Sequence, residues 1–177
     1  RYLLGEPRLE LGEATPSAAA SHPVQLLLPS EAPPYEQVHP DRRAAMRRSS
    51  TLAALAAGHP FSFLVTSAAG LLRRVVPPEP LRAATLELRR EMEVDLREIA
   101  NRLTRAGYLR NPVVEDPGCV AVRGGLLDVW APEDSAPVRV ELSGDTISGL
   151  RRFDPDTQRT ADAVDRVWLP PATDLLV

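Results

Sequence analysis

The sequence predicts a mixed chain, with a partial α/β layer of parallel strands followed by an α+β domain in which one helix packs on an antiparallel sheet. Continuous apolar runs at residues 24–29 and 61–67 are each followed by a helical pattern. That order is typical of parallel strands in an α/β layer. Beyond residue 85 one helical pattern is followed by short strands separated by turn residues, which is typical of an antiparallel meander.

The two parts are predicted to meet near residue 84. We assign residues 1–84 to the later portion of the α/β layer and residues 85–171 to the α+β domain. Residues 172–177 are a linker or a return to the first part. The opening segment, RYLLG, is typical of the end of a helix and has no signal-peptide pattern. We therefore expect the chain to be a piece of a longer protein.

The first part is expected to run strand, helix, strand, helix. The run at 24–29 is predicted to be a strand buried on both faces. Pro40 opens a helix that ends at Gly58, since proline is favoured at the first helical position and glycine just past the last. The run at 61–67 is a second buried strand. Ser67 caps the next helix, which the following PPEP segment stops.

The second part opens with a short alternating strand at 85–90 and one amphipathic helix. Asp95 is predicted to cap this helix, with Glu98 three residues on as in a capping box, and Gly107 ends it. Only strands follow, separated by turns rich in glycine, proline and aspartate. We predict them at residues 108–116, 119–124, 126–132, 137–144, 146–154 and 164–170.

Composition excludes several classes of function. The 177 residues are 44% hydrophobic and carry a net charge of −3, so overall charge does not indicate a nucleic-acid binder. All basic residues are arginine, which excludes chemistry that depends on lysine. Cys119 is the single cysteine, so we expect a reducing compartment and a cytoplasmic location. No apolar run reaches the ~20 residues of a membrane span, and no membrane partner is expected.

Strand alternation places two arginines on one face of the predicted sheet. In the strand at 137–144, Arg139, Glu141 and Ser143 share the face opposite the apolar residues. In the strand at 119–124, Arg123 faces outward together with Cys119 and Ala121. If the strands are neighbours, Arg123 and Arg139 project from the same exposed face. Two solvated arginines without a function are the alternative, because most exposed charges have none.

A second group of arginines lies on the predicted helix that precedes Gly58: Arg42, Arg43, Arg47 and Arg48. Arg43 and Arg47 are four residues apart and so share a helix face. Contact with nucleic acid is one hypothesis. A solvated helix face, or pairing with acidic groups of a neighbouring domain, is the alternative.

No catalytic or metal site is predicted. The chain has no phosphate-binding loop of the G-x-x-x-x-G-K-[ST] type and no recognisable hydrolytic triad. His22, His39 and His59 do not have the spacing of metal ligands. The pair Gly124–Gly125 is expected to form a tight turn.

The second part contains a series of motifs at fixed spacing. They begin with GY-R, V-x-x-P-G-x-x-x-V-R-G-G-x-x-D and P-x-R-[IVL]-[ED], and continue with G-x-x-[IV]-x-x-[IL]-R and F-D-x-x-[TS]-Q-R. These motifs are carried by Gly107, Tyr108, Arg110, Pro117, Gly118, Val122, Arg123, Gly124, Gly125, Asp128, Pro137, Arg139, Glu141, Gly144, Ile147, Leu150, Arg151, Phe153, Asp154, Thr157, Gln158 and Arg159. With them the second part resembles the bacterial transcription-repair coupling factors, whose N-terminal module is similar to the excision-repair helicase UvrB.

The resemblance implies a degenerate helicase-like domain at residues 1–84 and a domain that binds UvrA at residues 85–171. In that family two arginines on the sheet face and a nearby aromatic residue contact UvrA. The arginines correspond to Arg123 and Arg139, and the aromatic position is occupied by Ser143. This departure removes the anchor that would fill a pocket of the partner. Glu141, which lies between Arg139 and Ser143 in the same predicted strand, is a further expected UvrA-binding residue.

The resemblance also implies properties of a longer protein. Such a protein is an ATP-dependent DNA translocase, with ATP and Mg²⁺ in motor domains outside this chain and with RNA polymerase and double-stranded DNA as further partners. The chain itself is expected to be a docking module rather than an enzyme, with no cofactor. Two alternatives remain: a fragment of UvrB, and a DNA-binding module that uses the Arg42–Arg48 helix.

Overall fold

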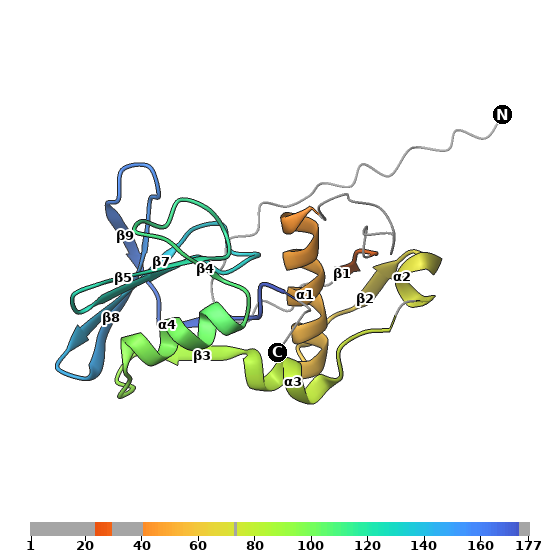
Figure 1. The fold of residues 1–177 in the computed structure, drawn as a ribbon, viewed down its shortest axis with the longest axis horizontal. Coiled ribbons are helices and arrows are strands. Elements are labelled where there is room, and N and C mark those ends of the chain that lie inside the picture. The colour runs from red at the N-terminus through yellow and green to blue at the C-terminus, as the bar shows by residue number, and fades with distance from the viewer. Residues whose placement is uncertain (1–23, 30–40, 73, 174–177) are drawn as a thin grey trace.

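The computed structural model describes residues 24–29, 41–72 and 74–173, and its mixed α/β and α+β architecture confirms the predicted fold class. A six-stranded sheet lies at one end of the molecule and a two-stranded parallel sheet at the other (Figure 1). Helix α1, Arg42–Ala57, stands between them. The predicted helix end at residues 1–5 and the expected opening of α1 at Pro40 lie outside the described residues.

In the first part, strand β1 (Val24–Leu27) pairs in parallel with β2 (Phe63–Thr66), as the sequence predicts. Helix α1 packs along β1, and the Thr51 hydroxyl donates a 3.0 Å hydrogen bond to the Leu26 carbonyl. Asp41 caps the helix by accepting from the Arg43 backbone N–H. Gly58 ends it in the left-handed conformation at φ 73°, which explains the predicted stop.

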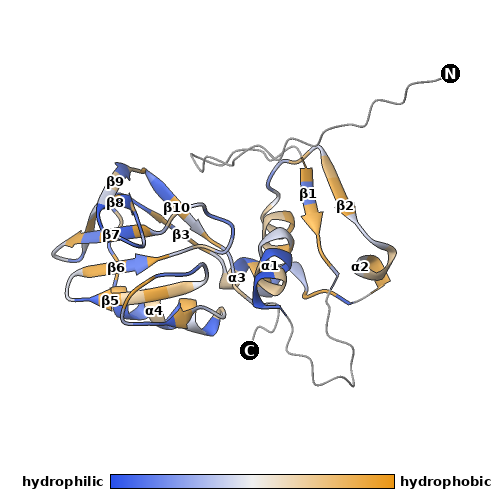
Figure 2. Cartoon of the chain, turned by 90° about the horizontal axis from the view of Figure 1, so that it is seen from above, coloured by the Kyte–Doolittle hydropathy of each residue, from blue (hydrophilic) through white to orange (hydrophobic). Residues whose placement is uncertain are grey.

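The prediction that both strands of this layer are buried on two faces is wrong. Phe63 is 67% exposed and Val65 50% exposed, and β1 is buried only towards its end at Leu27. The strands are strongly apolar, as Figure 2 shows, but α1 covers only one side of them. The sequence pattern therefore reports the hydrophobicity of the strands correctly but not their burial, which depends on the elements packed against them.

The segment after β2 also differs from the prediction. Helix α2 is short, Ala68–Leu72, and the PPEP segment opens a helix instead of only stopping one. Helix α3, Pro78–Ala84, has proline at its first positions, where the missing N–H has no helical partner to lose. Leu81 of α3 anchors it by packing with Leu27 and Leu52 in a small buried cluster.

In the second part, strand β3 (Leu86–Arg89) pairs antiparallel with the last strand, β10 (Arg166–Leu169), in a separate two-stranded sheet. Helix α4, Leu96–Arg105, begins after Asp95, whose carboxylate accepts from the Arg97 and Glu98 backbone N–H groups as predicted. The ring of His59, just past α1, lies 4.7 Å from that of Trp168 on β10.

The remaining strands form the six-stranded sheet in the order β4-β5-β6-β7-β8-β9. Strands β5 to β9 follow as an antiparallel meander. The strand bounds are β4 Leu109–Arg110, β5 Cys119–Arg123, β6 Leu126–Val129, β7 Val138–Ser143, β8 Thr146–Phe153 and β9 Thr160–Ala163.

Two details of this sheet correct the sequence prediction. The strand expected at 108–116 is reduced to the two residues of β4, and it pairs with β5 in parallel. Strand β9, Thr160–Ala163, was not predicted, because its four residues are all exposed and carry no apolar alternation. Edge strands of this kind are held by backbone pairing, which leaves little trace in a hydrophobic pattern.

Helix α4 covers one face of the six-stranded sheet, the inner face. Its apolar residues, such as Leu103, join Val120, Leu127, Val140 and Leu150 in the main core. The opposite or outer face is not simply solvated. Val114, Cys119, Ala121 and Phe153 form a second small cluster there, with Trp130 packed against it. The expectation that Cys119 and Ala121 are exposed is therefore wrong, because the loop between β4 and β5 folds over that end of the face.

Helix α1 also contacts the second part directly. The Arg42 guanidinium donates to the carbonyls of Pro117 and Gly118 at 3.0 and 2.8 Å, and Met46 joins the main core. Gly118 has φ 74°, and a side-chain carbon there would lie 2.4 Å from the Met46 sulfur. The glycine is therefore required both by the turn and by the close approach of α1.

Candidate functional site

The candidate site is centred on Asp128, in the middle of the six-stranded sheet. In the register of the sheet Asp128 stands opposite Ala121 on β5 and Arg139 on β7. Directly paired residues point to the same face, so the carboxylate lies on the outer face, away from α4. Asp128 is nonetheless 1% exposed, because the side chains of the neighbouring strands close over it.

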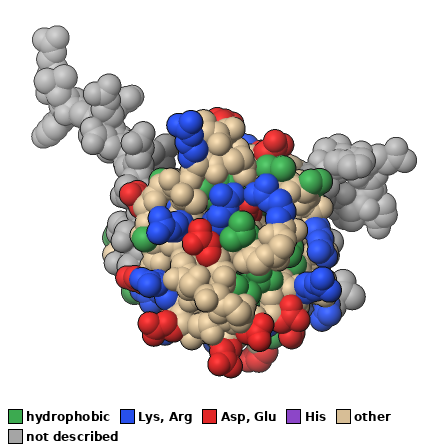
Figure 3. Space-filling view, turned by 90° about the vertical axis from the view of Figure 1, so that its left-hand side faces the viewer, with side chains coloured by type: hydrophobic (Ala, Val, Ile, Leu, Met, Phe, Trp, Pro, Cys, Tyr) green, Lys and Arg blue, Asp and Glu red, His purple; other side chains and the backbone are tan. Residues whose placement is uncertain are grey.

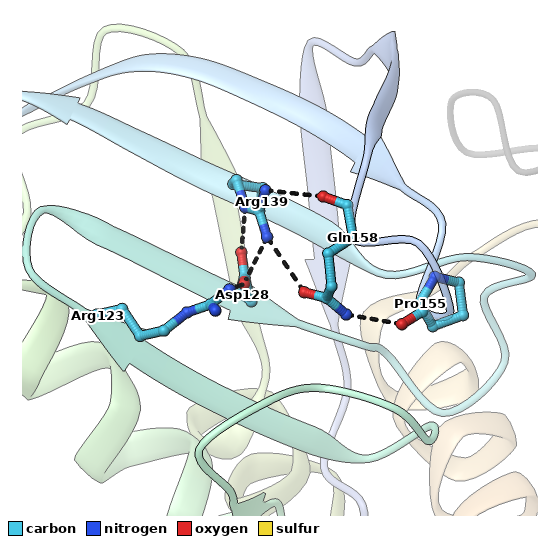
Figure 4. Close-up of polar contacts among 5 residues, drawn as sticks. All are labelled: Arg123, Asp128, Arg139, Pro155 and Gln158. Atoms are coloured by element: carbon cyan, nitrogen blue, oxygen red, sulfur yellow. Dashed lines mark hydrogen bonds and ion pairs between the residues drawn. The ribbon is translucent and has the colours of Figure 1, made fainter.

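Two arginines bind this carboxylate from opposite sides (Figure 4). Arg139 approaches side-on, with Nε donating to Oδ1 at 2.7 Å and Nη2 donating to Oδ2 at 2.9 Å. Arg123 reaches across from the end of β5 and donates from Nη2 to Oδ2 at 2.6 Å. We call Arg123, Asp128 and Arg139 the arginine–aspartate cluster. Charge-assisted bonds of this length are the strong members of their class.

Arg139 is enclosed on its other sides as well. Its guanidinium carbon lies 4.6 Å from the centre of the Phe153 ring, a cation–π contact. Nη1 donates to the Gln158 carbonyl at 3.3 Å, and Nη2 lies 3.5 Å from Oε1 of the same residue. The hydrogen bond to Asp128 raises the pKa of Arg139 above its ordinary value. The Arg139 side chain is thus a positively charged group held in place against the outer face of the sheet.

Gln158 is held in place by the turn between β8 and β9. The Asp154 carboxylate accepts from the backbone N–H groups of Asp156 and Thr157, at 2.9 and 2.8 Å, and these bonds lower the Asp154 pKa. Gln158 itself has φ 59°, and its Nε2 donates to the Pro155 carbonyl at 2.7 Å. The FDPDTQ segment therefore forms a turn that places Gln158 beside Arg139.

These contacts correct the expectation that Arg123 and Arg139 project as two available guanidinium groups. They do share one face, but both are engaged with Asp128. The side chain of Arg123 is 44% exposed and that of Arg139 only 13%. Among the described residues, Nε and Nη1 of Arg123 have no hydrogen-bond partner, whereas the donors of Arg139 face Asp128 and Gln158. Arg123 is thus the accessible member of the pair.

The other two predicted site residues lie farther along β7. Glu141 stands opposite Leu126 on β6 and is half-buried. Ser143 is exposed at the end of β7, beyond a register shift between Glu141 and Leu142. Neither nearby apolar side chain replaces an aromatic residue at position 143. Leu142 packs against the main core, and the Trp130 indole donates to the Asp134 carbonyl.

Sequence reasoning missed the roles of Asp128 and Gln158. A usable signal for Asp128 was present. The turn Gly124–Gly125 joins β5 and β6 through two residues, which fixes their register and places an acidic side chain beside both arginines. Gln158 had no such signal, because its contact depends on a left-handed backbone conformation and on how the β8–β9 turn folds back.

The four arginines of α1 do not form one exposed surface. Arg48 is buried and donates to the Leu28 carbonyl, and Arg42 is directed at the β4–β5 loop. Arg47 pairs with Glu133 at 3.3 Å, and Arg43 is exposed. Helix α1 therefore uses Arg42 and Arg47 to contact the second part. A contact of this helix with nucleic acid remains a prediction, with fewer arginines available than the sequence suggested.

The end of the molecule that carries the six-stranded sheet bears charges of both signs. In Figure 3 arginine side chains are scattered over this face, and acidic side chains gather along its lower edge. A mixed surface is more typical of protein partners than of a nucleic-acid backbone. In the described part of the chain, no three histidine, cysteine or acidic side chains are arranged to hold a metal ion. None of the described helices has the length and apolar character of a membrane span.

Comparison with known proteins extends this description. The family model described as the UvrB interaction domain matches residues 86–175. A transcription-repair-coupling factor of Myxococcus xanthus is 43% identical over 156 residues, covering 88% of this chain and 13% of that protein. The protein of the same name from Staphylococcus aureus strain USA300 is 35% identical over 130 residues, 73% of this chain and 11% of that protein. This chain thus spans a small fraction of the relatives it matches.

Proposed function

Because this chain belongs to the family of UvrB interaction domains and is homologous to transcription-repair coupling factors, we propose that it is a docking module that binds UvrA in transcription-coupled nucleotide excision repair. The observation that supports this most directly is the arginine–aspartate cluster on the outer face of the sheet. A rigid sheet that displays an accessible guanidinium group suits recognition of a carboxylate on a partner protein.

The two arginines of the cluster have different roles in this proposal. Arg139, enclosed by Asp128, Phe153 and Gln158, keeps the buried carboxylate neutralised. Arg123 holds Asp128 through one donor only and is accessible, so it can exchange that contact for a carboxylate of UvrA. The exchange leaves Asp128 paired, which avoids the cost of a buried, uncompensated charge.

The assignment to a coupling factor rather than to UvrB itself rests on the relatives. The identity of 43% extends over 88% of this chain, so it includes the first part as well as the matched domain. For the longer protein we propose ATP-dependent translocation on double-stranded DNA and contact with RNA polymerase, with ATP and Mg²⁺ bound in motor domains outside this chain. We propose no catalytic role for the residues described.

Calorimetric titration of the chain with UvrA from the same organism tests the docking function. Arg123→Ala is the informative variant, because its exposed side chain can be removed without emptying the core. Loss of a charged contact that becomes desolvated on binding typically costs about 2–5 kcal/mol, so we expect affinity to fall at least tenfold. Arg105→Ala, on the exposed side of α4, is the matched control and should bind normally. Full affinity in the Arg123 variant, with an unchanged fold, contradicts the proposed site.

A further inference from the structure

A third arginine stands on the outer face, beside Arg139. Arg151 on β8 is the direct cross-strand partner of Arg139 on β7. Directly paired residues share a face, so its side chain leaves the sheet on the side of the arginine–aspartate cluster. Arg151 is exposed, and the structure gives it no hydrogen bond or ion pair to any described residue.

The placement of Arg151 is unfavourable unless something else balances it. Like charges directly opposite each other on neighbouring strands destabilise a sheet. Asp128 neutralises part of the charge of Arg123 and Arg139, and Glu141 is the other carboxylate among these strand positions. Three guanidinium groups therefore face two carboxylates, and the excess positive charge is the one that Arg151 brings.

We propose that Arg151 is a further partner-contacting residue, which binds a carboxylate of UvrA beside the one taken by Arg123. The inference deepens the docking function proposed above and rests on it. Arg139 is 13% exposed and its donors are occupied, so it cannot offer a free fork to a partner. Arg151 occupies the neighbouring position on β8, is exposed, and has no hydrogen bond or ion pair to any described residue, so its guanidinium fork is available to a partner.

The partner chemistry that follows is specific. The outer face presents an accessible guanidinium group on each side of Arg139, on β5 and on β8. Such an arrangement fits two acidic side chains on UvrA, one on each side of Arg139, rather than one isolated carboxylate.

Binding to UvrA measured for four variants tests the inference: Arg151→Ala, Arg151→Lys, Arg123→Ala and Arg97→Ala. Arg97 is exposed on α4, at the inner face, and serves as the control for loss of one positive charge. We expect Arg151→Ala to weaken binding about tenfold and Arg97→Ala less than about twofold. Arg151→Lys should recover only part of the affinity, because lysine keeps the charge but not the fork.

The same samples distinguish docking from folding. Removing Arg151 relieves a like-charge pair, so its thermal midpoint should stay equal or rise, whereas a structural role would lower it. If Arg123→Ala loses binding and Arg151→Ala behaves like Arg97→Ala, the role of Arg151 is overturned while the docking function stands. If the unaltered chain does not bind UvrA, the docking function itself is overturned and this inference with it.

Discussion

Asp128 and Arg139 face each other across β6 and β7 and are joined by two hydrogen bonds, of 2.7 and 2.9 Å. The carboxylate is 1% exposed, so it depends on this arginine for its charge balance. Arg139 is in turn fixed by Phe153 and Gln158. The outer face is therefore organised around a buried ion pair, and the accessible arginines are arranged about it.

Removal of Asp128 should destabilise the sheet. In Asp128→Ala the largely enclosed Arg139 loses its counterion, and breaking a buried pair by removing one partner costs about 3 kcal/mol or more. We expect a lower urea midpoint with an unchanged denaturant slope, measured by far-ultraviolet circular dichroism.

Asp145→Ala is the control for the loss of a carboxylate. Asp145 is exposed in the β7–β8 turn, and surface changes of this kind usually stay within about 0.5 kcal/mol. Equal stability of the two variants would show that the ion pair contributes nothing to the fold.

Gly118→Ala should separate helix α1 from the second part. The new methyl group would lie 2.4 Å from the Met46 sulfur and 2.8 Å from Nη2 of Arg42, at a backbone φ of 74°. Overpacking of this kind costs about 1–3 kcal/mol, in addition to about 1 kcal/mol for a non-glycine residue at positive φ. The measurement is the free energy of unfolding from urea titration.

Gly144→Ala is the control that measures the cost of a non-glycine residue at positive φ without any overpacking. Gly144 has φ 64°, but a side-chain carbon there meets nothing within 4 Å. The Gly118 variant should therefore lose at least about 1 kcal/mol more than the Gly144 variant. A smaller or reversed difference would mean that α1 moves aside without cost and that the contact with Arg42 does not hold the two parts together.

Local sequence rules predicted much of the fold. The cap at Asp95, the stop at Gly58, the parallel pair β1–β2 and the meander from β5 to β8 all follow from residues adjacent in the chain. The incorrect predictions about the fold share another cause. The burial of β2 and the existence of β9 depend on neighbours across the sheet, which hydrophobic periodicity within a segment does not report.

The same distinction applies to the candidate site. Alternation placed Arg123 and Arg139 on one face, because the side-chain period of a strand is local. Their engagement by Asp128 is a property of the register between three strands, and the contact with Gln158 depends on a turn nineteen residues from Arg139. Whether a charged side chain is free to contact a partner thus depends on the tertiary structure, even where the sheet face it points to can be predicted from the sequence.

Asp134 should make stability depend on pH. Burial raises the pKa of its carboxyl from 3.8 to about 6, although Arg152 acts in the opposite direction. The folded chain therefore holds this proton more tightly than the unfolded chain, so stability falls as pH rises from about 4 to about 6 and stays lower above that. Asp134→Asn removes the charge and should be about 1–2 kcal/mol more stabilising at pH 8 than at pH 4.5.

Thermal or urea unfolding at the two pH values measures this difference. Asp156→Asn is the control, because Asp156 is exposed in the β8–β9 turn. The carbonyl of Asp134 that accepts from Trp130 belongs to the backbone and is preserved in the variant. A gain that is the same at both pH values would show that titration of Asp134 is not its source.

Ser143→Phe should strengthen docking without changing the fold. Position 143 is exposed at the end of β7, where the resemblance to coupling factors places an aromatic contact residue. Aromatic side chains that fill a pocket are the commonest anchors of protein interfaces, and they bury a large area with few rotatable bonds. We expect calorimetry to show an affinity for UvrA that is about three- to tenfold higher, a gain of roughly 1 kcal/mol. Ser135→Phe places the same ring on an exposed loop at the opposite end of β7, and it should leave affinity unchanged. An equal gain in both variants would indicate nonspecific association through the added ring, and no gain at position 143 would mean that UvrA offers no pocket there.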